Sequence, residues 1–311
     1  MKITFFVQPS TRYFSKDFYL DINKCEGCWE AIISNLRYAF CLLDDVIVSE
    51  KYVTVLNMNG QMMFDINNIE NDTDVLIISM CSDAWNGIDW NYIRQNTSIK
   101  KIITVSECSY NWRDKYNQPD WGFVFLKQLV NQTSTHIPFP CRKDICENVQ
   151  KNKVVVMDHY YTHNFGNGPI DWTFRISDWL EDIKDRYEIR RMVHINGEEI
   201  HVKQHEKSLI KCSIGEYYAK TQDAETYIIT HQESFGYSVI DMLARGIRVI
   251  SPPNFLNAEF NSTFKIPIFT NKEEMLNIIT SELDLYWNTC IDQCTDYIEI
   301  ANIIYQKLLT L

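Results

Sequence analysis

The chain has 311 residues, of which 45% are hydrophobic and 13% are aromatic, so it is long enough and apolar enough for two folded domains. Its formal net charge of −11 argues against a broad surface for nucleic acid or for anionic membranes, because such surfaces are basic. We therefore expect a folded enzyme or binding protein that has no nucleic acid partner.

The first half of the chain alternates strand-like and helix-like segments. A continuous apolar run over residues 74–80 predicts a buried strand, and apolar residues at helical spacing over 28–42 predict an amphipathic helix. The other predicted strands of this half cover residues 3–7, 45–49, 52–58 and 101–105, the other predicted helices cover 89–95 and 122–130, and residues 136–140 close it.

The polar stretch over residues 142–153 indicates a linker, after which the alternation begins again. The predicted strands of the second half cover residues 154–157, 189–195, 208–211, 227–230, 248–251 and 266–269, and the predicted helices cover 172–186, 215–221, 272–281 and 297–311. Alternation of this kind is typical of parallel, doubly wound sheets. Two similar α/β domains with a cleft between them are the simplest interpretation.

The segment over residues 231–253, HQESFGYSVIDMLARGIRVISPP, is the most informative part of the sequence. A strand leads into a glycine turn and a short amphipathic helix, which is expected to end at Gly246. Glu233 lies on the turn, and Asp241 follows eight positions later inside the helix. A carboxylate beside the amides of a helix N-terminus suits a ligand that carries hydroxyl and phosphate groups.

This segment, with the strand before it (DAETYIITHQESFGYSVIDMLARGIRVISPP), resembles the donor-binding core of retaining glycosyltransferases with the GT-B fold. The resemblance is strongest to the large family-four group, the glycosyl transferases group 1. Those enzymes carry an acid after a strand, a Phe-Gly pair just behind it, and a second acid after seven further residues. The end of the chain, CTDYIEIANIIYQKLLTL, resembles the closing helix of that family, and THIPFP resembles the end of its first domain.

The resemblance implies an α/β fold of two Rossmann-like, doubly wound domains that face a cleft. Residues 1–148 would form the N-terminal acceptor-side domain, residues 149–294 the nucleotide-sugar-binding domain, and residues 295–311 a closing helix that returns to the first domain. The implied activity transfers a sugar from a nucleotide-diphosphate donor to a hydroxyl of a glycan, a lipid-linked molecule or a small molecule, with retention at the anomeric carbon. The implied enzyme needs no cofactor and no metal.

The resemblance also assigns roles to individual residues. Glu233 corresponds to the first acid, which contacts the hydroxyls of the donor sugar, and it is the predicted catalytic residue. Asp241 corresponds to the second acid, which accepts hydrogen bonds from the ribose. The predicted donor-binding residues at the helix start are Phe235, Gly236, Tyr237 and Ser238. From the residues alone, Asp241 could instead form a capping box with Ser238, and Glu233 could be a solvated loop acid.

One loop departs from the family pattern. The family follows the first strand of its second domain with a Gly-Arg pair and then a Lys, whereas residues 157–172 of this chain contain neither Arg nor Lys. The amides of Gly166, Asn167 and Gly168 could form an anion-binding nest, and the next cation along the chain is Arg175. We predict a diphosphate loop from these four residues.

The missing cations leave two other classes of function open. The chain could be a non-catalytic carbohydrate- or nucleotide-binding module, because a fold does not determine a function. DNA-base glycosyltransferases use the same fold, but the acidic charge balance disfavours a surface for duplex DNA.

The cysteines and the N-terminus exclude several further features. Cys25 and Cys28 have the spacing of a zinc knuckle, but no second close pair accompanies them, so we expect reduced thiols and no metal site. The start, MKITFFVQPS, has too few apolar residues for a signal peptide, and no run approaches the roughly 18 apolar residues of a membrane-spanning helix. We expect a cytoplasmic protein with at most peripheral contact at the inner face of the membrane.

Overall fold

The computed structural model describes most of the 311 residues. The described ranges are residues 1–7, 28–50, 53, 55–58, 61–64, 66–79, 90–106, 119–130, 132–146, 149–160, 171–194, 206–210, 214–230 and 236–311, and for some residues of these helices and strands only the backbone is described. The predicted site residues Glu233, Phe235, Gly166, Asn167 and Gly168 lie outside the described residues.

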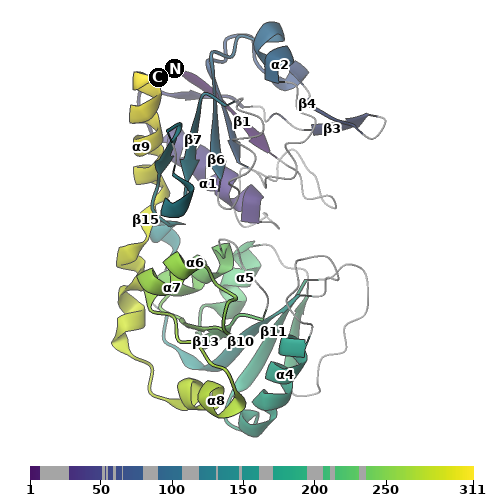
Figure 1. Cartoon of the computed structure of the whole chain (residues 1–311), viewed down its shortest axis with the longest axis vertical. Coiled ribbons are helices and arrows are strands. Elements are labelled where there is room, and N and C mark those ends of the chain that lie inside the picture. The colour runs from purple at the N-terminus through teal and green to yellow at the C-terminus, as the bar shows by residue number, and fades with distance from the viewer. Residues whose placement is uncertain are drawn as a thin grey trace. The chain divides into compact units, whose positions relative to one another are not determined.

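The chain forms two compact units (Figure 1). Unit 1 comprises Met1–Pro140 and Thr295–Leu311, and unit 2 comprises Cys141–Cys294. The chain therefore passes from unit 1 to unit 2 between Pro140 and Cys141, a few residues before the boundary at 148/149 that the sequence predicts.

Unit 1 is built on a six-stranded parallel sheet with the spatial order β2-β1-β5-β6-β7-β8. Its strands are β1 (Lys2–Val7), β2 (Ile47–Val48), β5 (Val75–Ser79), β6 (Lys101–Ser106), β7 (Trp121–Val124) and β8 (Ser134–His136). The other elements of this unit are α1 (Cys28–Cys41), β3 (Val55–Met58), β4 (Gln61–Phe64), η3 (Ile66–Asn68), α2 (Trp90–Asn96), η5 (Lys127–Leu129), β15 (Thr295–Asp296) and α9 (Tyr297–Thr310). Two-residue strand β9 (Pro140–Cys141) pairs with β15.

The C-terminal helix α9 returns to unit 1 and contacts α1, as the resemblance implied (Figure 1). Asp296 caps its start, because its carboxylate accepts from the N–H of Ile298 at 2.8 Å. At the other end, Lys101 Nζ donates to the carbonyl of Leu308 at 2.6 Å, and Lys307 Nζ lies 3.7 Å from the centre of the Trp121 ring. A buried stripe holds α9 against the unit; its residues are Tyr297, Ile300, Ala301, Ile304 and Leu308.

The helix predicted over residues 122–130 is wrong. Residues Trp121–Val124 form strand β7, which pairs in parallel with both β6 and β8. Gly122 and Phe123 are both buried, because an inner strand of a parallel sheet is covered on both faces. A short apolar run of this kind cannot be distinguished from a buried helix by its period, and only the flanking turns argue for a strand.

Unit 2 is built on a five-stranded parallel sheet with the spatial order β12-β11-β10-β13-β14. Its strands are β10 (Asn152–Tyr160), β11 (Glu188–His194), β12 (Glu206–Ile210), β13 (Ala224–Ile228) and β14 (Arg248–Ile250). Its helical elements are η6 (Lys143–Ile145), α4 (Asp171–Trp179), η7 (Leu180–Ile183), α5 (Ile214–Thr221), α6 (Tyr237–Ala244), α7 (Ala258–Phe264), α8 (Lys272–Thr280) and η8 (Leu285–Gln293). The order is that of a doubly wound sheet, and it reverses direction between β10 and β13.

The core of unit 2 lies between this sheet and helices α4 and α8. The continuous helix predicted over 172–186 is two elements, because the α-helical part ends at Trp179 and continues as the 3₁₀ turn η7. Tyr187, just behind them, donates its hydroxyl to the carbonyl of Ile279 in α8 at 3.2 Å. The buried residues of this core are Val155, Met157, Ile176, Leu180, Ile183, Tyr187, Ile189, Ile228, Ile250, Phe269, Met275 and Ile279.

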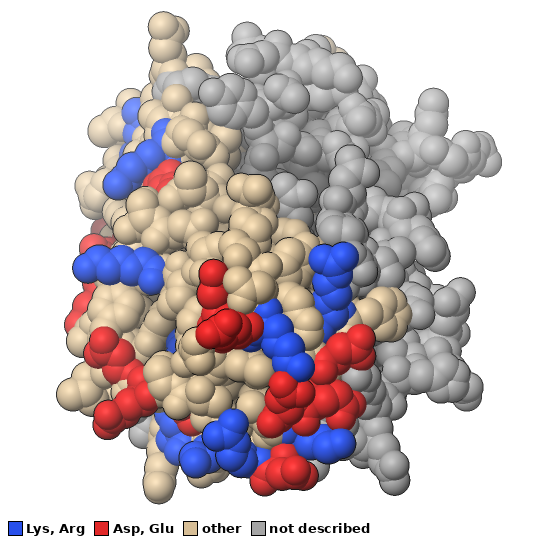
Figure 2. Space-filling view, turned by 60° about the horizontal axis from the view of Figure 1, so that its bottom comes forward, with Lys and Arg blue, Asp and Glu red and all other residues tan. Residues whose placement is uncertain are grey.

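Within the described part of the chain, none of the helices is both long and apolar enough to cross a membrane. The face of the molecule in Figure 2 carries basic and acidic side chains interspersed rather than a basic field. Ion pairs such as Lys184–Glu181 (3.0 Å) and Lys272–Asp182 (2.6 Å) are of this mixed kind.

Candidate functional site

The topology of unit 2 singles out one edge of its sheet. In open parallel sheets, ligands bind outside the carboxyl ends of the strands, at the point where the strand order reverses. Here that point lies between β10 and β13, which pair directly, with Met157 opposite Ile228. The loop after β10 contains Gly166, Asn167 and Gly168, and the loop after β13 contains Glu233 and Phe235. Both loops lie outside the described residues, but the strands that carry them are neighbours.

Helix α6 begins at this edge with a glycine in the left-handed conformation. Gly236 has φ 74° and ψ 57° and precedes the first helical residue, Tyr237. A side chain is rarely tolerated at this φ, so the turn requires glycine. The first amides of a helix have no partner within it, and the helix dipole adds positive potential there. The start of α6 therefore suits an anionic group.

Ser238 lies in the first turn of α6. Its Oγ accepts a hydrogen bond of 3.2 Å from the hydroxyl of Tyr227, a fully buried residue of β13. This bond joins the helix start to the strand before it. The capping-box alternative is wrong, because Ser238 is the second residue inside the helix and Gly236 stands at the N-cap position. The predicted helix end is confirmed: α6 stops before Gly246, which has φ 71°.

Asp241 is the most perturbed described residue of the predicted site. It is 6% exposed, and its Oδ2 accepts a hydrogen bond of 2.9 Å from the hydroxyl of Tyr218 in α5. Burial raises the pKa of Asp241 to about 7, while the charge of Arg245 and the Tyr218 hydrogen bond act in the opposite direction. Near neutral pH, Asp241 therefore exchanges between the acid and the carboxylate.

Sequence reasoning missed Tyr218 and Arg245 as neighbours of Asp241. The guanidinium of Arg245 lies 3.7 Å from the centre of the Tyr218 ring, and Tyr218 in turn bonds Asp241. Arg245 follows Asp241 by four residues, a spacing that places two side chains on one face of a helix, so its signal was present in the sequence. Tyr218 had no such signal, because it comes from a different helix.

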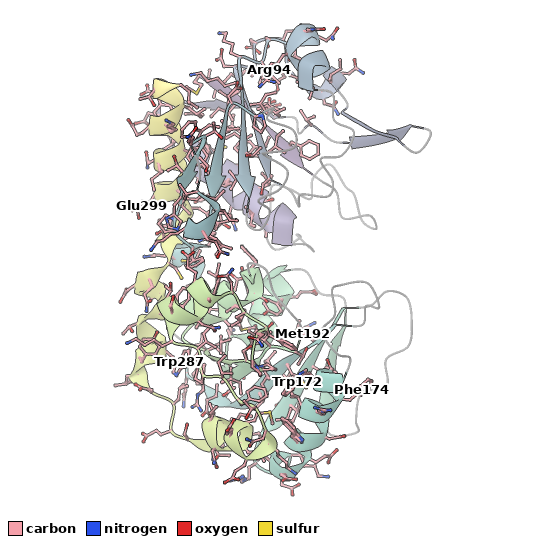
Figure 3. The ribbon with its side chains drawn as sticks, in the orientation of Figure 1. Arg94, Trp172, Phe174, Met192, Trp287 and Glu299 are labelled. Atoms are coloured by element: carbon pink, nitrogen blue, oxygen red, sulfur yellow. The ribbon has the colours of Figure 1, made fainter. Side chains whose placement is uncertain are left out.

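The predicted cation Arg175 is an exposed residue of α4, the helix that follows the β10 loop. Its guanidinium lies 6.0 Å from the ring of Trp172. Trp172 packs edge-to-face against Trp179, Phe255 and Phe269 at 6.0 to 6.2 Å, on the inner side of α4 (Figure 3). Trp172 is therefore a packing residue and not an exposed platform for a sugar.

No group of three or more His, Cys, Asp or Glu among the described residues is arranged to hold a metal ion. Asp72 and Asp74 have the spacing of an Asp-x-Asp metal motif, but they pair with Lys2 Nζ at 2.7 Å and with Lys100 Nζ at 2.8 Å, respectively. The described cysteines, Cys41, Cys141, Cys146, Cys290 and Cys294, are free thiols.

Comparison with known proteins finds no match to a family model and no match to a curated protein. Solved structures do match over the whole chain. The lipopolysaccharide outer core galactosyltransferase WaaB, in its apo form, aligns with a TM-score of 0.61 at 13% identity and covers 99% of this chain and 100% of its own. Anabaena HepE in complex with UDP aligns with a TM-score of 0.60 at 11% identity and covers 100% of both chains.

The UDP-GlcNAc 2-epimerase from Neisseria meningitidis, bound to UDP-GlcNAc, is also similar. It aligns with a TM-score of 0.57 at 9% identity, with 100% of both chains covered. The chain therefore has the GT-B fold. At such low identity these similarities establish the fold alone, since one fold supports many activities.

Proposed function

We propose that this protein transfers a sugar from a nucleotide-diphosphate donor to a hydroxyl acceptor, with retention at the anomeric carbon. The observation that supports this proposal most directly is the start of α6. A left-handed glycine, the amides of a helix N-terminus and a buried acid follow one another in the register of the glycosyltransferase motif, at the reversal point of the sheet. Similar structures that bind UDP or a UDP-sugar support a nucleotide ligand.

In this proposal the donor lies along the first turns of α6. The amides of Tyr237 and Ser238 bind the diphosphate, Asp241 accepts a hydrogen bond from the ribose, and Glu233 holds the hydroxyls of the donor sugar. To reach the ribose, Asp241 would share or exchange its bond with Tyr218. The Gly166–Gly168 amides and Arg175 bind the remaining phosphate charge. Both groups follow the neighbouring strand β10.

The reaction needs no side-chain nucleophile. The bond from the anomeric carbon to the diphosphate oxygen breaks, and the acceptor hydroxyl forms a bond to that carbon from the same face. The departing diphosphate takes the proton of the hydroxyl. The contribution of the protein is to position donor and acceptor and to stabilise the charge that develops on the diphosphate.

A second activity, epimerisation of the sugar on its nucleotide, is supported by the full-length similarity to a UDP-GlcNAc 2-epimerase. The two activities differ in what they require. A transferase releases nucleoside diphosphate faster when an acceptor is present, whereas an epimerase converts the donor without any acceptor. The products formed in one incubation, with and without an acceptor, therefore distinguish the two activities.

The experiment is a screen of uridine, guanosine, adenosine and thymidine diphosphate sugars by thermal stabilisation, followed by product analysis with and without hydroxyl acceptors. We expect one class of nucleotide to raise the melting temperature and its sugar to be transferred. Stabilisation by a nucleotide without any turnover would favour a binding module. No response to any of the donors would refute a nucleotide-sugar function.

A further inference from the structure

The amino edge of the unit 2 sheet brings two cations together. Lys151 precedes β10, Gln222 precedes β13, and Arg245 precedes β14. These three strands are consecutive in the sheet and run parallel. The residues before them therefore lie at the same edge, which is opposite to the edge where α6 begins.

Arg245 is a buried charge without a polar partner among the described side chains. Its side chain is 5% exposed, and its guanidinium lies flat against Tyr218 at 3.7 Å from the ring centre. Within the described part of the chain, its Nε has no hydrogen-bond partner and its guanidinium forms no salt bridge. A buried guanidinium nitrogen in this state is unfavourable, because it has given up water without gaining an acceptor.

Lys151 is the second cation of this edge. Its Nζ donates to the carbonyl of Gln222 at 2.7 Å, and the N–H of Gln222 donates to the carbonyl of Tyr218 at 3.0 Å. Through these two bonds Lys151 is tied to the same helix, α5, whose Tyr218 ring supports Arg245. Burial, together with the charge of Arg245, lowers the pKa of Lys151 to about 8, while the charge of Asp223 acts in the opposite direction.

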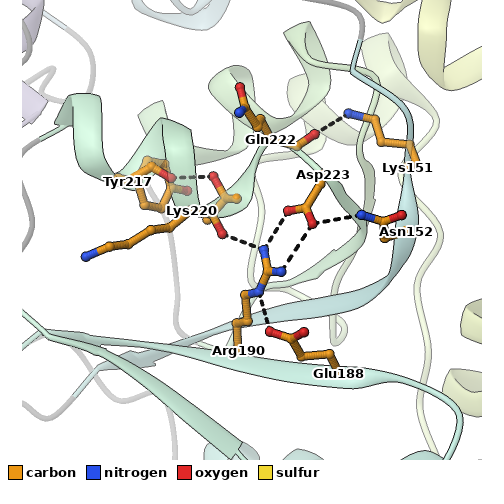
Figure 4. A network of polar contacts seen from close by, with 9 residues as sticks. Lys151, Asn152, Glu188, Arg190, Tyr217, Lys220, Gln222 and Asp223 are labelled. Carbon is orange, nitrogen blue, oxygen red and sulfur yellow. Dashed lines mark hydrogen bonds and ion pairs between the residues drawn. The ribbon is translucent and has the colours of Figure 1, made fainter.

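The acids nearest to these cations already have partners. Asp223 accepts from Arg190 Nη1 at 2.5 Å, from Arg190 Nη2 at 3.2 Å and from Asn152 at 3.0 Å (Figure 4). Asp241 accepts from Tyr218, and its burial keeps it partly protonated near neutral pH. The pair of cations therefore carries more positive charge than the described acids around it neutralise.

We propose that Arg245 and Lys151 form a binding site for a small oxyanion, such as a phosphate group, at the amino edge of the unit 2 sheet. The planar guanidinium offers a fork of donors to such an anion, and the lysine adds a second charge. Strand β13 has 5 residues, which puts this site about 16 Å from the start of α6, so it is separate from the proposed nucleotide site. It would hold either free phosphate or the phosphate of an effector molecule.

The test compares sodium phosphate with sodium chloride at equal ionic strength and pH 7, using the full chain and its melting temperature. We expect phosphate to raise the melting temperature saturably, by at least about 2 °C. Arg245→Met and, independently, Lys151→Met should abolish the rise. Lys220→Met, at an exposed position in the last turn of α5, is the matched control and should retain it.

Three results would overturn the proposal. The first is the absence of any phosphate-specific rise in the wild type. The second is a rise that persists in both variants or disappears at saturating UDP, since the phosphate would then occupy another site. The third is loss of the rise in Lys220→Met as well, because the effect would then not be specific to Arg245 and Lys151. A phosphate–protein dissociation constant from titration calorimetry provides a second readout if one variant fails to fold.

Discussion

The two edges of the unit 2 sheet differ in how their strand ends are bonded. At the amino edge, Arg190 binds Glu188 at 2.8 Å and Asp223 at 2.5 Å (Figure 4). The buried Arg248 at the same edge bonds Glu225 at 3.4 Å. At the carboxyl edge, the described start of α6 has a glycine turn and a hydrogen bond between Tyr227 and Ser238.

This difference separates stability from function. Charged side chains that bond one another at the amino edge fix the starts of the strands and leave few groups for a ligand. At the carboxyl edge, the N-cap residue Gly236 has no side chain with which to cap the first amides of α6, so this helix start suits a ligand. The exception is Arg245, which lies at the densely bonded edge but has no polar partner among the described residues.

The largest expected effect is a change of stability with pH that is caused by Asp241, midway along α6. Its folded-state pKa is about 7 instead of 3.8, so the folded chain binds a proton that the unfolded chain releases. This contribution to the free energy of unfolding is fully present below about pH 4 and is lost as the pH rises through 7. With about 1.4 kcal/mol per pKa unit, the loss is on the order of 4 kcal/mol at most.

Asp241→Asn removes this titration. Urea unfolding at pH 5 and at pH 8 should show a fall in stability for the wild type and a much smaller fall for the variant. Asp292→Asn, at an exposed acid of η8, is the control and should behave as the wild type. An unchanged fall in Asp241→Asn would mean that another group is responsible.

The next prediction tests how much the side-chain bonds at the amino edge contribute to stability. Arg190→Met leaves Asp223 with Asn152 and removes the bond to the carbonyl of Lys220 at 2.7 Å, so we expect a loss of about 2–3 kcal/mol of unfolding free energy. Nucleotide affinity should stay within a factor of two, because the site lies at the other edge. Arg186→Met, at an exposed arginine of the same region, should cost less than about 0.5 kcal/mol. A large loss of nucleotide affinity in Arg190→Met would contradict the separation of the two edges.

The third prediction tests whether the carboxyl edge carries the proposed reaction. Glu233→Gln should keep the fold and the nucleotide affinity but lower turnover by about ten- to more than a hundred-fold, since a charge-assisted hydrogen bond of about 1.5–3 kcal/mol is lost. Steady-state kinetics with saturating donor measures this change. Glu282→Gln, at an exposed acid of unit 2, should leave turnover unchanged. Equal activity of both variants would remove Glu233 from the reaction.

Much of this fold could be predicted because local patterns determine it. The apolar run over 74–80 became β5, the helical spacing over 28–42 became α1, and Gly246 ends α6 as expected. The helix predicted over 122–130 failed because a short apolar run has no distinctive period, and its pairing partners β6 and β8 come from outside the segment.

The site was predictable only where its residues are close in sequence. The spacing from Gly236 to Asp241 is readable in one segment, and the structure places these residues on one helix. The burial of Asp241 and its bond to Tyr218 depend on the packing of α5 against α6, which no local pattern encodes. The roles of Glu233 and of Gly166–Gly168 remain predictions.

The smallest effect compares two glycines of unit 2, one just after the end of α6 and one in the first turn of α5. Gly246, at the amino edge, has φ 71°, and a Cβ there would lie 2.6 Å from Asn288 Oδ1. Gly246→Ala should therefore cost about 1–2 kcal/mol in unfolding free energy, from backbone strain and from the displacement of Asn288. Gly215→Ala, in the first turn of α5, replaces a glycine at a helical position and should be neutral or stabilising by up to about 1 kcal/mol. Adding Asn288→Ala to Gly246→Ala separates the two causes, because it removes the close contact and leaves the strained φ. Full recovery in the double variant would show that packing alone requires glycine at this end of the helix, whereas no recovery would assign the whole cost to the backbone.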